Sequence, residues 1–186
     1  MAETRNTIHL WRHPRPRGAE GRCIGRTDLS VDDRKAKRLA HRIRQAARRE
    51  RLERVIWTSP LQRSADVGRW LQRWGWQHRI DPRLIEIDFG CWDGQRWSEI
   101  DPAQISVWAD NFLHHGPGGG ESLDQLRHRV REVLADPAAP SLIVGHAGWI
   151  NALRTLALPA PRASDWPAPP RYGQSQRFSL ETPTCP

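Results

Sequence analysis

Two histidines stand where short apolar runs of the sequence end, and their residue type suits nucleophilic or proton-transfer chemistry. His13 directly follows Arg12, and His146 directly follows Gly145 within a stretch of small residues. An imidazole can attack as a nucleophile or carry a proton near neutral pH. Because Pro14 disfavours helix at this point, the chain has to turn and leave the His13 ring at the end of its run. A lone histidine is more often structural, so this interpretation depends on the groups that converge with it.

Arg63 is a candidate anion-binding residue. Ser59 is a suitable N-cap and Pro60 suits the first helical position, which places Arg63 within the first turn of a predicted helix. The helix dipole disfavours a cation there unless the guanidinium and the helix start share an anionic ligand. An arginine that points to solvent is the alternative.

The segment 84–90 offers a carboxylate for proton transfer. Glu86 and Asp88 alternate with Ile85 and Ile87, so the two carboxylates share one face of the segment. We interpret one of them as a candidate general acid. We expect Asp88 to face solvent, which leaves Glu86 as the candidate.

Alternating apolar runs and helical patterns predict how these residues come together. Strands are predicted at 7–11, 55–58, 141–145 and 176–180, and helices at 31–50, 60–75, 121–135 and 147–157. The alternation predicts an α/β fold, a three-layer sandwich of a mostly parallel sheet with helices on both faces. Ligands bind beyond the carboxyl ends of such strands, so His13, Ser59 and His146 should meet in one crevice.

The chain length fits a single domain over residues 1–186, because one hydrophobic core can close a chain of this size. The segment 158–173 lacks periodicity and is rich in Pro, Ala and Arg, so we expect a surface connection there. No apolar run is long enough for a membrane helix, and the polar first residues are not followed by an apolar signal core. These features favour a cytoplasmic protein with no membrane partner.

The formal net charge of +8 should attract anions. The richest basic run, Arg34 to Arg51, carries apolar residues at helical spacing, which places its basic residues on the outer face of a helix. We expect a solvated face and no nucleic-acid partner, since no nucleic-acid motif accompanies the run. The odd number and unmatched spacing of Cys23, Cys91 and Cys185 predict reduced thiols, not a disulfide framework or a zinc site.

Five short motifs resemble, in order and spacing, those of the histidine phosphatase superfamily, which includes the cofactor-dependent phosphoglycerate mutases. They are Leu10-Trp11-Arg12-His13, Thr58-Ser59-Pro60-Leu61-Gln62-Arg63, Glu86-Ile87-Asp88-Phe89-Gly90, Gly120-Glu121-Ser122 and Val144-Gly145-His146-Ala147-Gly148. The resemblance implies a phosphoglycerate mutase-like α/β fold. It also implies a hydrolase of small phosphomonoesters that works through a phosphohistidine, without a metal and without a cofactor.

The resemblance assigns roles to individual residues. It implies that His13 is the nucleophile, that Glu86 is the proton donor, and that Arg12, Arg63 and His146 hold the phosphoryl oxygens, with His146 also counted as catalytic. Guanidinium groups match phosphate oxygens bidentately and stay charged, so they can neutralise the transferring group without a metal. We expect His13 to attack as a neutral imidazole whose other nitrogen donates to a backbone carbonyl.

The chain departs from the family pattern after the Arg-His pair. Pro14 stands where the family usually has glycine, so a backbone N–H to phosphate is lost at that position. The polar residue, often Asn, that many members carry several positions later has no clear counterpart. The roles of Arg15, Arg17 and Arg26 are left open.

The branch of the family is suggested by one loop. The mutases are usually longer, so a simple phosphatase fits better. Segment 21–29 looks similar to the alpha-ribazole phosphatase branch, which removes a 5′-phosphate during cobalamin assembly. By that similarity Trp92 or Trp97 would stack on a heteroaromatic base, with core packing as the alternative. A protein phosphohistidine phosphatase, a mutase-like enzyme, a phosphate-binding protein without turnover and a nucleic-acid-binding protein stay open.

Overall fold

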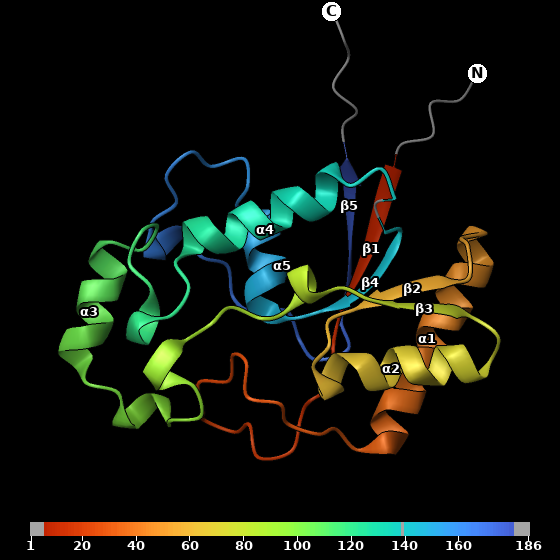
Figure 1. Cartoon of the computed structure of the whole chain (residues 1–186), viewed down its shortest axis with the longest axis horizontal. Coiled ribbons are helices and arrows are strands. Elements are labelled where there is room, and N and C mark those ends of the chain that lie inside the picture. Colours follow the sequence, from red (N-terminus) through yellow and green to blue (C-terminus); the bar gives the residue numbers. More distant parts are fainter. Residues whose placement is uncertain (1–5, 139, 181–186) are drawn as a thin grey trace, which may run out of the picture.

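A five-stranded, mostly parallel sheet forms the centre of the structure, a computed structural model that describes residues 6–138 and 140–180 (Figure 1). The strands are β1 (Asn6–Arg12), β2 (Val55–Thr58), β3 (Gln77–Ile80), β4 (Leu142–Gly145) and β5 (Ser175–Leu180). Their order across the sheet is β3-β2-β4-β1-β5. Strand β1 runs parallel to β4, and β2 runs parallel to β3 and β4, whereas β5 runs antiparallel to β1.

Helices cover both faces of this sheet (Figure 1). The helices are α1 (Asp33–Glu50), α2 (Gln62–Arg73), α3 (Pro102–Asp110), α4 (Leu123–Ala135) and α5 (Ala147–Arg154). Neighbouring residues of a strand point to opposite faces, so Leu10 packs with α4 and α5, whereas Trp11 packs with α1 and α2. The predicted α/β fold, a mostly parallel sheet between two helical layers, is confirmed.

Helix α1 contains the basic run singled out in the sequence. Its buried residues are Ala36, Leu39, Ala40, Ile43, Ala46 and Ala47. These side chains form one stripe that packs in the same apolar cluster as Trp11 and Val144 of the sheet. The prediction that the helix buries its apolar stripe is confirmed. Cys23 is buried and Cys91 is exposed, both as free thiols, and Cys185 lies outside the described residues.

The start of α2 differs from the prediction. The helix begins at Gln62, so Ser59 and Pro60 lie in the turn before it. The backbone N–H of Gln62 donates over 2.7 Å to a carboxylate oxygen of Asp28, which comes from a distant loop. The prediction of Ser59 as the N-cap was wrong because a carboxylate remote in sequence takes that position. Arg63 nevertheless lies in the first turn of the helix, as predicted.

Two elements were not predicted. Strand β3 is a short, largely exposed edge strand, and α3 has no buried residue. Neither therefore carries the apolar pattern by which an element is recognised in a sequence. In the described part of the chain, five short 3₁₀ turns complete the connections, at Pro82–Leu84, Gly90–Trp92, Trp97–Glu99, Pro117–Gly119 and Ala163–Asp165. Among the described residues, no helix combines the length and apolarity needed to cross a membrane.

Candidate active site

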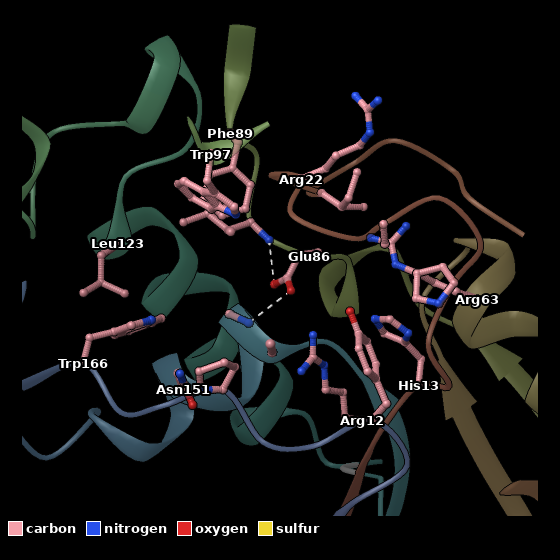
Figure 2. A pocket seen from close by; sticks show the side chains of 18 of the residues that line it. Arg12, His13, Arg22, Arg63, Glu86, Phe89, Trp97, Leu123, Asn151 and Trp166 are labelled. Atoms are coloured by element: carbon pink, nitrogen blue, oxygen red, sulfur yellow. Dashed lines mark hydrogen bonds between the residues drawn. The ribbon is translucent and has the colours of Figure 1, made fainter. Parts of the chain in front are cut away.

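A pocket of about 340 Å³ lies beyond the carboxyl ends of the central strands (Figure 2). Four of the five predicted site residues line it, namely Arg12, His13, Arg63 and Glu86. Arg12 ends β1, Arg63 lies in the first turn of α2, and Glu86 follows the 3₁₀ turn after β3. The parallel sheet thus brings segments that are far apart in sequence to one place.

The ring of His13 is oriented by the backbone of the next residue. Its Nδ1 lies 2.7 Å from the carbonyl oxygen of Pro14. A carbonyl oxygen only accepts, so Nδ1 carries the proton and Nε2 keeps its lone pair in the neutral ring. Burial, followed by the nearby guanidinium of Arg63, lowers the pKa of His13 well below 6.5. The ring is therefore neutral at neutral pH, with Nε2 available as a nucleophile.

His146 lies against His13 but does not line the pocket. The two ring centroids are 4.9 Å apart, and His146 is fully buried. Its Nε2 lies 2.7 Å from the hydroxyl oxygen of Ser59, whereas its Nδ1 has no hydrogen-bond partner within the part of the chain that is described. Burial and, next, the charge of Arg63 lower the pKa of His146 well below 6.5.

Arg12 is held by the segment that precedes β5. Its Nη1 donates to the carbonyl oxygen of Pro170 over 2.6 Å, and its guanidinium carbon lies 3.8 Å from the centre of the Tyr172 ring. The same tyrosine ring lies 5.6 Å from the ring of His13. A cation over an aromatic face is stabilised by the ring quadrupole, so Tyr172 fixes the plane of the guanidinium.

The segment 158–173 is largely exposed, in agreement with the expected surface connection, but it also contributes to the site. Trp166, Pro169 and Tyr172 all line the pocket. The amide nitrogen of Asn151 in α5 donates to the carbonyl oxygen of Pro167 over 2.7 Å and ties this segment to the helix. The sequence did not predict this contribution to the site, because contacts between distant parts of the chain leave no periodic pattern.

Arg63 is held by the carbonyl groups of a loop. Its Nη1 donates to Thr27 over 2.7 Å and its Nη2 to Gly25 over 2.5 Å. The carboxylate of Asp93 fixes the same loop by accepting the backbone N–H groups of Gly25, Arg26 and Thr27 over 2.9, 2.8 and 2.8 Å. Each terminal nitrogen of a guanidinium carries two hydrogens, so one on each remains for a ligand.

The carboxylate of Glu86 takes the place of a side-chain cap on α5. Its two oxygens accept the backbone N–H groups of Gly148 over 3.1 Å and Trp149 over 3.2 Å, and one of them also accepts the N–H of Ile87 over 3.0 Å. A Cβ at Gly148 would lie 2.5 Å from a Glu86 oxygen, so only glycine permits this approach. Figure 2 shows Glu86 between the arginine end of the pocket and its aromatic walls.

Other charged residues considered from the sequence lie outside the pocket lining. Asp88 is partly exposed and faces Arg26 over 3.4 Å, in line with the expectation that it points away from the site. Arg15 and Arg17 each form an ion pair with a nearby carboxylate. Neither of the two arginines lines the pocket.

Trp92 and Trp97, which were both expected near the site, lie in different surroundings. Trp97 lines the pocket and is 39% exposed. Trp92 is 2% exposed, donates its indole N–H to Gln104 and packs edge-on against Trp108. Of the two, Trp97 is therefore the residue that can contact a ligand, and Trp92 belongs to the core.

Sequence reasoning missed Arg22 and Asn151 as residues of the lining. Arg22 lines the pocket while its Nη1 donates to the carbonyl oxygen of Gly94 over 2.7 Å. Asn151 lines it from α5. Arg22 lies in the segment 21–29, and the resemblance of that segment was the signal that could have found it. Asn151 stands outside the five motifs, and no local signal in the sequence marks it.

The charges of the described lining favour an anion. The lining contains three guanidinium groups and one carboxylate, that of Glu86. Arg63 is buried and Arg12 is partly buried, whereas Arg22 is exposed. Burial of cations without a counter-charge is costly, so a bound anion would stabilise this end of the pocket. Within the described ranges, no group of three or more His, Cys, Asp or Glu side chains could hold a metal ion.

Comparison with known proteins identifies the family. The model of the histidine phosphatase superfamily (branch 1) matches residues 8–181. Glucosyl-3-phosphoglycerate phosphatase of Mycobacterium tuberculosis is 32% identical over 131 residues, which cover 61% of this chain and 58% of that protein. The protein of the same name from Mycolicibacterium vanbaalenii is 30% identical over 165 residues, which cover 80% of this chain and 72% of the relative.

The solved structures agree with this assignment. The native structure of mycobacterial glucosyl-3-phosphoglycerate phosphatase superposes with a TM-score of 0.73 at 25% identity, over 93% of this chain and 89% of that chain. The chain matches only 58% of the length of the curated Mycobacterium tuberculosis relative. With the family match spanning nearly all of the described residues, the chain belongs to branch 1 of the histidine phosphatase superfamily.

Proposed function

We propose that this protein hydrolyses small phosphomonoesters through a phosphohistidine on His13. In the first step Nε2 of His13 bonds to phosphorus, the bond to the leaving oxygen breaks, and Glu86 gives that oxygen a proton. In the second step Glu86 takes a proton from a water molecule that bonds to phosphorus, and the N–P bond breaks. Phosphate leaves, and both residues return to their starting states.

The orientation of His13 carries this proposal. Its Nδ1 is committed to the Pro14 carbonyl, which leaves a neutral ring with Nε2 as the reactive atom. The adjacent guanidinium groups of Arg12 and Arg63 offer charge-assisted hydrogen bonds to the phosphoryl oxygens. Phosphoryl transfer depends mainly on positioning and charge stabilisation, and this constellation supplies both.

We assign His146 to the catalytic and phosphate-binding groups as part of the proposal. Its ring contacts that of His13, and its hydrogen bond to Ser59 fixes its orientation. A phosphoryl group on His13 would come close to this ring. Arg63 would use the two hydrogens that the carbonyls of Gly25 and Thr27 leave free.

The finer substrate class is a separate part of the proposal. The loop 21–29 suggests alpha-ribazole 5′-phosphate, whereas the relatives reported above are named for glucosyl-3-phosphoglycerate. We keep alpha-ribazole phosphate as a candidate because Trp97, which can contact a ligand, lines the pocket. The proposal also includes a cytoplasmic location and no metal or cofactor in the reaction.

Rapid-quench labelling with a ³²P-labelled phosphomonoester tests the mechanism. The wild-type protein should form an acid-labile, base-stable phosphoenzyme, and His13→Ala should form none and show no turnover. Asp88→Asn, which changes a carboxylate outside the pocket lining, is the matched control and should label like the wild type. Labelling of His13→Ala at the wild-type level would refute the assignment of the nucleophile.

A further inference from the structure

The walls of the pocket beyond Glu86 are aromatic, and we propose that they bind a leaving group with a flat, largely apolar ring system. This inference rests on the proposed function, because the group that occupies the walls is the alcohol side of the phosphomonoester. It names the class of substrate that the site would take. The class is aromatic or heteroaromatic and not a polyhydroxylated sugar.

Two sets of rings face the space beyond Glu86. Phe89 and Trp97 form one set, with their rings edge to face and 5.7 Å apart. Trp108, Phe112 and Trp166 form the other, with successive ring centroids 5.3 and 5.4 Å apart. All five side chains line the pocket. Figure 2 shows Phe89 and Trp97 on one side of the space and Trp166 on another.

The position of Glu86 fixes the direction in which a leaving group would extend. Arg12, His13 and Arg63 lie on one side of its carboxylate and the aromatic walls on the other (Figure 2). A proton donor has to lie at the leaving oxygen. With phosphorus near His13, the carbon attached to that oxygen therefore points toward the aromatic walls.

The walls offer few acceptors for hydroxyl groups, because the indole rings of Trp97, Trp108 and Trp166 carry N–H donors only. Apart from Arg12, His13, Arg63 and Glu86, the charged or amide side chains of the described lining are Arg22 and Asn151. The amide nitrogen of Asn151 already donates to Pro167, and its oxygen accepts from Arg154 over 3.4 Å. Hydroxyl groups that lose water without gaining partners weaken binding, so a sugar ring is disfavoured here.

A flat aromatic ring would bind these walls more favourably than a sugar ring. Rings stack favourably on indole and phenyl faces in offset or edge-to-face geometry. Trp97 is 39% exposed at the pocket, so a large apolar surface stands open to solvent beside the site. A ring that covers this indole removes apolar area from water. The volume of about 340 Å³ lies in the range of small-molecule pockets.

A pair of phosphate esters tests the inference. 2-Phenylethyl phosphate and glucose 6-phosphate carry the same phosphate and both release a primary alcohol, so their leaving oxygens are chemically similar. We expect kcat/KM for 2-phenylethyl phosphate to be at least about tenfold higher. An equal or higher kcat/KM for glucose 6-phosphate would overturn the inference and leave the proposed hydrolysis intact.

A variant locates the effect in the aromatic walls. Trp166→Leu should reduce the ratio of the two kcat/KM values about tenfold, because it keeps an apolar side chain but removes the ring face. Trp70→Leu is the matched control, since Trp70 lies on α2 and packs near Trp74, outside the pocket lining. It should leave the ratio unchanged. An unchanged ratio in a folded Trp166→Leu protein would contradict the proposal.

Binding of phosphonates separates this inference from the proposed function, because it needs no turnover. 3-Phenylpropylphosphonate should bind at least about tenfold more tightly than methylphosphonate in titration calorimetry. If neither ester is hydrolysed and no phosphoenzyme forms, the proposed function fails. Tighter binding of 3-phenylpropylphosphonate than of methylphosphonate would still support an aromatic site in that case. Equal affinities of the two phosphonates would refute the proposed aromatic site.

Discussion

The imidazole rings of His13 and His146 lie 4.9 Å apart in buried surroundings and share the neighbouring charge of Arg63. Two protonated rings at this distance would repel each other and the guanidinium in a medium of low dielectric constant. The pKa values of both histidines are lowered well below 6.5, first by burial and then by Arg63. The folded protein therefore keeps both rings neutral where the unfolded chain would protonate them.

This difference predicts that the protein loses stability in mild acid. Below about pH 6.5 the unfolded chain binds a proton at each of these histidines and the folded chain does not, so the free energy of unfolding falls as the pH falls. Each of the two rings contributes a slope of up to about 1.4 kcal/mol per pH unit. Urea unfolding followed by circular dichroism at pH 7, 6 and 5 measures it.

Two variants control the acid experiment. His13→Gln should remove one histidine's share of the slope. His128→Gln, at a side chain that is 74% exposed, should leave the slope as it is. A free energy of unfolding that does not change between pH 6.5 and 5 would contradict the buried neutral state of the pair.

Glu86→Gln should slow turnover most for esters whose leaving oxygen needs a proton. An alkyl phosphate needs protonation of its leaving oxygen, so its turnover should fall by about 10²- to 10⁴-fold, whereas p-nitrophenolate departs with little assistance and its release should fall far less. Single-turnover rates with both esters measure the difference. If both esters slow equally, the role of proton donor has to be withdrawn from Glu86, and Asp88 is the next carboxylate to test.

The same substitution should also lower stability. An amide has one oxygen where Glu86 uses two to accept the N–H groups at the start of α5, so at least one of them loses its partner. The expected loss is about 1 kcal/mol, the usual effect of removing a helix cap. Thermal unfolding measures it, and an unchanged Tm would show that the capping contacts contribute nothing.

Asp93→Asn should weaken phosphate binding although Asp93 is not part of the pocket lining. Its carboxylate fixes the loop whose carbonyls hold Arg63, and an amide cannot accept all three N–H groups. We expect KM for a phosphomonoester and the inhibition constant of inorganic phosphate to rise about tenfold, with a smaller change in kcat.

Asp101→Asn is the matched control for this positioning role. Asp101 caps α3 by accepting the N–H of Ala103, outside the pocket lining. It should leave KM and the inhibition constant of phosphate unchanged, because asparagine caps a helix about as well as aspartate. If Asp93→Asn lowers Tm and leaves the inhibition constant of phosphate unchanged, Asp93 has a structural role only.

Chelation of metal ions should leave the reaction intact. The proposed mechanism takes its positive charge from Arg12 and Arg63, which stay protonated at any working pH. Turnover with 5 mM EDTA, about the usual concentration for removing divalent ions, should equal turnover without it. A loss that added Mg²⁺ or Mn²⁺ restores would contradict the mechanism.

The sequence predicted the elements whose pattern is local. Buried strands such as β4 and the amphipathic helix α1 carry their own apolar periodicity, and their residues agree with the predicted ones to within two positions. Strand β3 is polar because it lies at an exposed edge, so its sequence shows no alternation. Whether one domain spans residues 1–186 stays a prediction.

The sequence predicted those residues of the candidate site that stand in recognisable motifs. His13, Arg63 and Glu86 stand in short motifs and line the pocket. Tyr172 does not stand in one, and its segment touches Arg12 across 158 positions of sequence, through the carbonyl of Pro170. Contacts of this kind depend on the closed fold, so reasoning about local patterns could not find them.

The place of β1 in the sheet has a consequence for the order of events during synthesis. Both of its neighbours, β4 and β5, are made late: His9 pairs with Leu142, and Ile8 pairs with Phe178. The strand that leads to His13 thus leaves the ribosome long before either partner exists, with apolar residues that are prone to aggregate while unpaired. The pair of strands β2 and β3 and the helices α1 and α2 precede β4 in the chain. The pocket is complete only after Tyr172, which lines it, has emerged.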